Sequence, residues 1–306
     1  MLSPDLFGFA TEGAIAAHGT IPPGMPWWQA WRLDPGLLIP MATVAWFYLR
    51  GLRRWDHRSR EHPWWRTAFF YAGLSAYALA MESPIDRLGA HHFSMHMVQH
   101  EIVMMYAVPM ILLGAPTTPL LRGLPRWLRL GVVRPLAGGA VTRNLYRAIT
   151  HPAAAIFVMT IVVWSWHLVP GWWEASLADQ RIHDLQHVSF TLASTLFWWN
   201  VIDPKPLHSR VPYLLRVLYI FGGTIPKHIL AAFITFAAHP FYPSYISAYR
   251  VLPIDPESDQ QLAGLIMWVP SEAFTLIVMA VVFFMWLGRE ERQQRRADAA
   301  QFSEPA

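Results

Sequence analysis

Hydrophobic residues of this chain gather in seven long segments that are separated by short polar or basic stretches. Each segment is close to the ~20 apolar residues that a helix needs to cross a bilayer. The pattern therefore predicts an all-α, polytopic membrane protein with seven transmembrane helices. The segments lie at about residues 35–52, 65–82, 92–114, 151–169, 182–202, 212–236 and 262–287.

Composition supports this class of protein. Hydrophobic residues make up 54% of the 306 positions and charged residues 14%, whereas a soluble domain carries about 25% charged residues. We expect an extracytoplasmic N-terminal segment (1–34), a transmembrane domain (35–287) and a charged cytoplasmic tail (288–306). The lipid bilayer is the expected surrounding, and nucleic acid is not expected as a partner.

Basic residues are concentrated on alternate loops. If the N-terminus lies outside, the inner loops carry 19 of the 24 Lys and Arg residues. Cytoplasmic loops are enriched in Lys and Arg, so the sequence predicts an outside N-terminus and an inside C-terminus. The longest inner loop, 115–150, interleaves Arg with Leu and Trp. It is either an interfacial helix on the anionic inner leaflet or a solvated basic loop.

Four pairs of adjacent tryptophans are expected to anchor the helices at the membrane–water interfaces, where aromatic side chains are enriched. Two pairs fall at the outer interface and two at the inner one. They are Trp27-Trp28 and Trp172-Trp173 outside, and Trp64-Trp65 and Trp198-Trp199 inside.

Histidines gather at the outer ends of the third, fourth and fifth predicted helices. In the third and fifth helices they are spaced i, i+4, so they share one stripe of the helix surface. Neutral imidazole is the commonest side-chain metal ligand, and a chain without cysteine has no thiolate to offer. The sequence therefore predicts an outward-facing metal site, with copper as the preferred ion. The expected ligands are His92, His96, His100, His167, His183 and His187.

Two neighbouring residues could add to this ligand set. Met95 lies one step from the histidine stripe and Gln99 lies within it. A thioether favours Cu(I), although methionine also fills gaps in helix packing. The alternatives are a b-type haem held by one histidine from each of two helices, or histidines that only hydrogen-bond water and carbonyls. Glu174 and Asp184 are the nearby candidates for a general base, and neither is convincing, so we do not expect an enzyme.

A second polar group lies deeper in the predicted membrane. Glu101, Lys227, His228 and Glu272 fall within the third, sixth and seventh segments. Charges at such depth are rare and usually paired. Matched depth suggests that Lys227 pairs with either Glu101 or Glu272. A transporter that uses these charges as an ion relay is a further alternative.

Several motifs spread over residues 35–290 form a combination that resembles one family. They are His96-Met97-Val98-Gln99-His100 with Pro109 to Pro116, Ser83-Pro84-Ile85-Asp86, Trp166-His167, and His183 to His187 followed by Trp198-Trp199. The combination resembles the CtaG family of seven-helix assembly factors for caa-type cytochrome c oxidase. The resemblance implies a bacterial plasma-membrane protein that matures a copper-containing oxidase, with the oxidase subunits as partners. The copper site itself rests on the histidine pattern.

Overall fold

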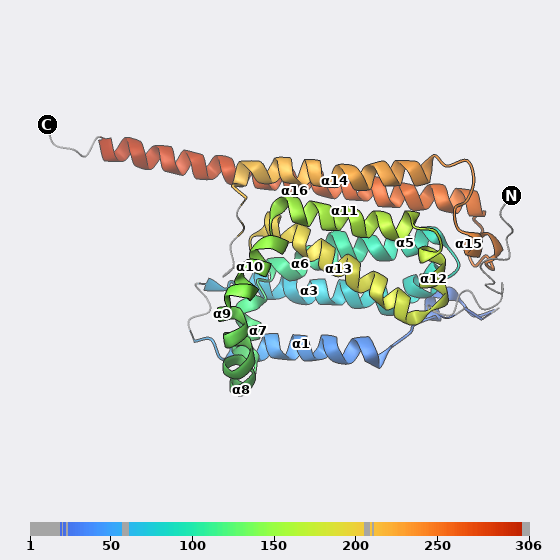
Figure 1. The fold of residues 1–306 in the computed structure, drawn as a ribbon, viewed down its shortest axis with the longest axis horizontal. Helices are drawn as coiled ribbons and strands as arrows, with labels where there is room; N and C mark the ends of the chain where they lie inside the picture. Colours follow the sequence, from blue (N-terminus) through green and yellow to red (C-terminus); the bar gives the residue numbers. More distant parts are fainter. Residues whose placement is uncertain are drawn as a thin grey trace.

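The described part of the chain is mainly helical and contains no strand, which confirms the all-α class. The long helices run side by side along one axis, and the last helix extends beyond the others (Figure 1). This computed structural model describes residues 19, 21–22, 24–56, 61–204, 209 and 211–301. Most of the expected N-terminal segment, and the loop residues His57, Arg58, Arg60, Lys205, His208 and Arg210, lie outside that part.

Seven long helical stretches occupy the seven hydrophobic segments. They are α1 (Pro35–Arg53), α3 (Trp64–Glu82), the continuous run α5 (Phe93–Glu101), η3 (Ile102–Ala107) and α6 (Val108–Leu113), then α11 (Pro152–Leu168), α13 (Gln180–Ile202), α14 (Tyr213–Thr235) and α16 (Pro256–Gln301). The last of these passes through residue 288, so the expected start of the tail falls inside one helix.

Length and composition alone identify some of these stretches as candidate membrane spans, but not all of them. Phe93–Leu113, Tyr213–Thr235 and Pro256–Arg296 meet that test, and Ala140–Ile149 with Pro152–Leu168 would add a fourth span if the bent pair is counted as one. The structure therefore supports a membrane protein with three or four candidate spans, fewer than the seven that we expected. The helix α13, for example, carries charged and histidine side chains in its first turns.

Short helices close the two ends of the bundle. The helices α12 (Trp172–Ala178) and α15 (Pro243–Ser247) lie at one end of the bundle (Figure 1). At the opposite end, the expected basic loop is helical. It consists of α7 (Thr117–Gly123), α8 (Arg126–Leu128), η4 (Arg129–Val133), α9 (Arg134–Gly138) and α10 (Ala140–Ile149). The remaining short elements are η2 (Trp27–Gln29) and α4 (Pro84–Gly89).

The third stretch changes from α-helix to the π-helix η3. In a π-helix each carbonyl bonds the N–H five residues later, which for Met104 is Pro109, and proline has no N–H. The hydroxyl of Ser194 (2.7 Å) and the indole N–H of Trp198 (3.0 Å) bond this carbonyl instead. Trp198 is buried between helices, so it is not the exposed interface anchor that we expected.

The helix α1 approaches the rest of the protein through two glycines. A Cβ at Gly51 would lie 1.7 Å from the carbonyl oxygen of Pro119 in α7, and a Cβ at Gly123 would lie 1.9 Å from that of Phe47 in α1. Only glycine permits backbones to come this close. The position of α1 thus depends on its contact with α7.

Candidate metal centre

The helix that carries the first histidines, α5, is capped by a residue of another helix. The buried carboxylate of Asp259, in α16, accepts the backbone N–H groups of Phe93 (2.8 Å) and Ser94 (3.2 Å). The first N–H groups of a helix have no partner within it, and a negative charge there is favourable. Asp259 therefore fixes the start of α5 although 165 residues separate it from Ser94. The sequence offered no signal for this contact.

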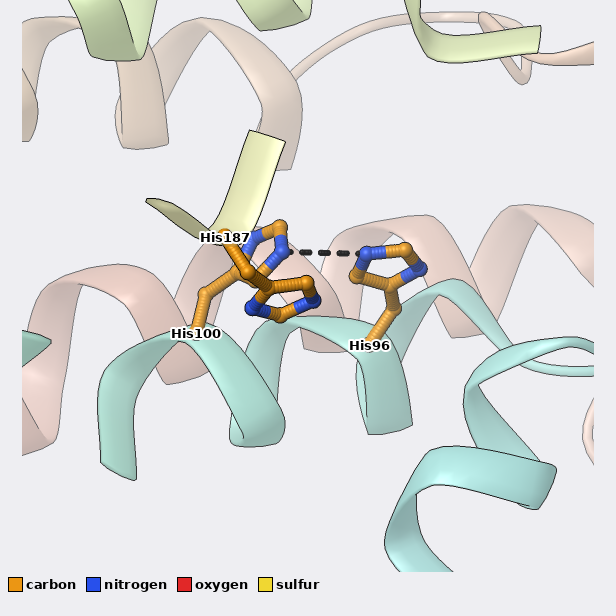
Figure 2. Close-up of side chains that lie close together, drawn as sticks. All are labelled: His96, His100 and His187. Carbon is orange, nitrogen blue, oxygen red and sulfur yellow. Dashed lines mark hydrogen bonds between the residues drawn. The ribbon is translucent and has the colours of Figure 1, made fainter. Parts of the chain in front are cut away.

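Three buried histidines from two helices converge beside this start. His96 and His100 project from α5, and His187 projects from α13 toward them (Figure 2). One ligand nitrogen from each lies within 4.8 Å of the others. The Nε2 atoms of His96 and His100 are 3.0 Å apart. We call these three residues the histidine trio.

His183 adjoins the trio as a fourth imidazole. Its Nε2 lies 3.0 Å from the Nε2 of His187, and its ring centroid lies 5.7 Å from that of His96. Two pairs spaced i, i+4, one on each helix, thus face each other. The structure brings together four of the six histidines that the sequence indicated.

The orientation of His96 follows from its contact with Tyr245 of α15. The Tyr245 hydroxyl donates to the carbonyl of Gly89 (3.0 Å) and lies 3.0 Å from His96 Nδ1. Burial raises the pKa of the Tyr245 phenol well above its ordinary value, so the hydroxyl keeps its proton. Because a hydroxyl has only one proton to donate, His96 Nδ1 must donate to the hydroxyl oxygen. The Nε2 lone pair of His96 is then left facing His100.

Aromatic rings enclose the trio. The centroid of the Trp173 ring lies 4.7 Å from that of His96 and 5.8 Å from that of His100. The Phe190 ring lies 4.6 Å from His100. Trp173 is only 1% exposed, so its expected role as an interface anchor is wrong; its neighbour Trp172 is the exposed member of the pair. Such a wall keeps water from the imidazoles.

His167, at the end of α11, packs against the same aromatic rings. Its ring centroid is 4.9 Å from that of Trp173. Its Nδ1 lies 2.7 Å from the carbonyl of Val163, and its buried Nε2 has no hydrogen-bond partner among the described residues. His167 is therefore near the trio without being part of it.

His92 lies outside the trio because α5 begins one residue later. It is the N-cap residue, with an extended φ of −135°, so the helical stripe does not reach back to it. Its Nε2 accepts the N–H of Leu252 (3.0 Å), and its Nδ1 lies 3.8 Å from Asp259. Burial lowers the pKa of His92 to about 4, which keeps the ring neutral. His92 thus joins α5 to the loop before α16.

Met95 and Gln99 also point away from the trio. Met95 packs in a small apolar cluster with Ile21 and Leu88. The amide nitrogen of Gln99 donates to Asp86 (2.8 Å). Neither side chain belongs to the group of possible metal ligands formed by His96, His100 and His187.

The two carboxylates considered as general bases have partners of their own. Glu174 accepts the backbone N–H of Ser244 (3.3 Å) and its hydroxyl. Asp184 accepts from the amide of Gln180 (2.6 Å) on the exposed side of α13.

The deeper polar group forms two separate pairs. Lys227 Nζ lies 2.6 Å from a carboxylate oxygen of Glu101 and donates to the hydroxyl of Ser271 (2.7 Å). Ser271 in turn donates to the other carboxylate oxygen of Glu101. His228 lies 3.3 Å from Glu272. Of the two partners that the sequence allowed for Lys227, Glu101 is therefore the one observed.

The histidine trio has the chemistry of a first-row transition-metal site. A histidine nitrogen binds such an ion at about 2.0–2.1 Å. If the two Nε2 atoms bound the same ion with an angle near 90° at the metal, they would lie about 3 Å apart, which matches the observed 3.0 Å. A set made only of imidazoles suits Zn, Cu, Fe and Ni. The donors fit such an ion, and the donors alone do not choose among these metals.

Comparison with known proteins supplies the family. The chain is 24% identical over 287 residues to an uncharacterised protein of Mycobacterium leprae, with 88% of this chain and 41% of the relative covered. Uncharacterised proteins of Mycobacterium bovis and Mycobacterium tuberculosis are each 24% identical over 275 residues, with the same coverage. The chain thus spans about two fifths of the length of these curated relatives. No solved structure matches it.

The family pattern itself covers most of the chain. The pattern described as cytochrome c oxidase caa3 assembly factor matches residues 46–289, a stretch that includes the histidine trio and the Glu101–Lys227 pair. The chain therefore belongs to the CtaG family of cytochrome c oxidase caa3 assembly factors.

Proposed function

We propose that this protein holds a copper ion at the histidine trio and passes it on during assembly of the oxidase. The observation that carries the proposal is the convergence of ligand nitrogens from His96, His100 and His187 within 4.8 Å of one another, in a buried position. The family supplies the process, which is maturation of a caa3-type oxidase. The oxidase subunits are the proposed partners.

The charge of the site favours Cu(I) over a divalent ion. All four imidazoles are neutral ligands, and the nearest carboxylate along α5, that of Glu101, is already paired with Lys227. The cost of burying an ion rises steeply with its charge, so a neutral ligand set in a dry pocket suits a monovalent ion better. Imidazole is an accepted ligand of copper.

The packing around the trio favours an ion over haem. The ring of His100 is held between the rings of His96 (4.4 Å), Phe190 (4.6 Å) and His187 (4.9 Å). A haem held by two histidines needs room for a macrocycle between them, and these distances are those of side chains in contact. An ion needs no such space.

A set of three ligands also suits transfer. A metal with three protein ligands keeps a position open for a ligand from outside. A ligand of the receiving protein can bind there before the ion leaves. His183, beside His187, is placed to complete or release the coordination.

We further propose that all seven long helical stretches span the bacterial plasma membrane, with the trio toward the outer face. The trio lies at the end of the bundle that holds α12 and α15, whereas the arginine-rich helices α7–α10 lie at the opposite end (Figure 1). Positive residues favour the cytoplasmic side. This orientation places the copper site on the outer side.

The test is metal binding by the full chain purified in mild detergent. After loading with Cu(I) and removal of excess metal, we expect copper by elemental analysis, with little bound to His96→Ala or His187→Ala. His92→Ala is the matched control, because His92 is equally buried and lies outside the trio. Equal copper in all four proteins, or none in the wild type, would overturn the proposal. A haem spectrum lost in the trio variants would favour an electron carrier.

A further inference from the structure

The end of the bundle opposite the trio carries a segment with a different chemistry. The helices from α7 to α10, residues 117–149, run across the direction of the long helices (Figure 1). The angle between α10 and the long helix α11 that follows it is 67°. If α11 crosses the membrane, α10 lies closer to the membrane plane than to its normal. We call residues 117–149 the basic cap.

The basic cap is strongly cationic. It contains six arginines, and the sequence has no Asp or Glu between residues 102 and 173. Among the described residues none of the six arginines forms an ion pair. No carboxylate of the described residues therefore neutralises these charges, although the Arg122 guanidinium lies over the Trp55 ring, 4.8 Å from its centroid. The six are Arg122, Arg126, Arg129, Arg134, Arg143 and Arg147.

The last helix of the cap, α10, separates its apolar and basic residues. Val141, Leu145 and Ile149 are spaced i, i+4, i+8 and share one stripe, while Arg143 and Arg147 lie on the other side of the helix. The apolar side chains are exposed, and Val141 reaches 81%. An exposed apolar stripe is unfavourable in water and favourable at the boundary of headgroups and acyl chains.

The same arrangement extends to the earlier part of the cap. Trp127 is 70% exposed and Leu136 is also exposed, and each lies within three residues of an arginine. Tryptophan favours the headgroup level of a bilayer. Arginine binds phosphate oxygens through two parallel N–H groups.

We propose that the basic cap is an interfacial segment that binds the phosphate groups of anionic lipids on the inner surface of the membrane. Its apolar side chains enter the acyl boundary, and its arginines contact the headgroups. The cap contacts the bundle near both of its ends. Trp199 of α13 donates to the hydroxyl of Tyr146 (3.2 Å), and Gly123 contacts α1. Lipid bound at the cap would thus also hold α1 in place.

The chain contains no cysteine, which allows a direct test with single-cysteine variants of the whole protein. A polarity-sensitive fluorophore is attached to Leu145→Cys, on the apolar stripe, or to the control Asn144→Cys, a quarter-turn round the helix. Each protein is placed in nanodiscs of phosphatidylcholine with or without phosphatidylglycerol. We expect the probe at 145 to shift to the blue and to lose quenching by iodide when phosphatidylglycerol is present. The probe at 144 should change much less.

Charge variants separate lipid binding from simple insertion. Arg143→Gln with Arg147→Gln should abolish the dependence on phosphatidylglycerol at position 145, whereas the paired lysine substitutions should keep most of it. Equal iodide quenching at 144 and 145 in anionic nanodiscs would overturn the proposal. So would burial of position 145 that occurs only when a soluble acidic protein is added, because the cap would then be a protein-docking surface.

Discussion

Two buried polar groups lie next to each other along α5, and their side chains are matched in different ways. The pair Glu101–Lys227, with Ser271 bridging its two members, matches a negative group with a positive one at 2.6 Å. The histidine trio, whose last member along α5 is His100, gathers three imidazoles, and the Nε2 atoms of His96 and His100 lie 3.0 Å apart. The first group pairs opposite charges within the protein, whereas the second has the arrangement that the proposed metal site requires.

The difference shows how to separate structural from functional polar residues in a membrane protein. A buried ion pair with all its partners stabilises the folded state relative to a variant in which one partner has been removed. The neighbouring imidazoles are hydrogen-bonded, His96 to His100 and His187 to His183, and the proposed ion would replace these bonds with metal–ligand bonds. The ion pair should therefore control stability, and the trio should control metal binding.

The largest effect is expected from breaking the ion pair. Lys227→Met leaves the carboxylate of Glu101 buried without its cation, which should cost about 3–5 kcal/mol of the free energy of unfolding. Thermal unfolding in detergent measures this loss. The double variant Glu101→Gln with Lys227→Met removes both charges and should recover most of the stability. A single variant as stable as the wild type would show that the pair is not essential to the fold.

The next effect concerns the trio and leaves the fold intact. His96→Ala and His187→Ala should each weaken copper affinity by more than about 100-fold, beyond the 10–100-fold that outer-shell partners usually contribute. Competition with a Cu(I) chelator measures the affinity. The unfolding midpoint without metal should stay near that of the wild type, in contrast to Lys227→Met. If Lys227→Met weakened copper binding more than the trio variants did, and the trio variants lowered the unfolding midpoint more than Lys227→Met did, the proposed contrast between the two groups would be wrong.

A smaller effect is expected from the residue that orients His96. Tyr245→Phe removes the acceptor of the His96 Nδ1–H, so the ring is free to change its tautomer, and copper affinity should fall about 10-fold. The ¹⁵N signals of the imidazole report the tautomer directly. Tyr249→Phe is the control, because that ring is mostly exposed. An unchanged tautomer in Tyr245→Phe would remove Tyr245 from the site.

The smallest effect is expected from the second pair of the deeper group. His228 and Glu272 are 3.3 Å apart, and the Glu272 side chain is 35% exposed. His228 is charged only when protonated, and even a fully ionised pair at this exposure contributes about 0–1 kcal/mol, so Glu272→Gln should change the unfolding free energy by less than about 1 kcal/mol. Thermal unfolding beside Lys227→Met gives the contrast. A loss as large as that of Lys227→Met would mean that Glu272 belongs to the buried network.

Features that depend on local periodicity follow from the amino-acid sequence alone. Runs of apolar residues gave the seven helical stretches, because a helix is stabilised by bonds between near neighbours. The spacing i, i+4 put His96 with His100, and His183 with His187, since each pair shares a face of its own helix. The rarity of buried charges limited the partners of Lys227 to Glu101 or Glu272.

The packing of the helices sets which helix faces meet. It chose Glu101 for Lys227, and it turned Gln99 toward Asp86 although Gln99 lies beside the histidines in sequence. Local sequence cannot specify such choices, because they depend on how each helix is rotated against its neighbours.

The same reason explains the residues that sequence reasoning missed or misplaced. Asp259, which is distant in sequence, caps the first residue of α5, and because α5 begins there, His92 lies outside the histidine stripe. Trp173 and Trp198 have the sequence context of interface anchors, yet contacts between helices bury them. Periodicity fixes the face of a helix on which a side chain lies, and packing between distant segments fixes what that face contacts.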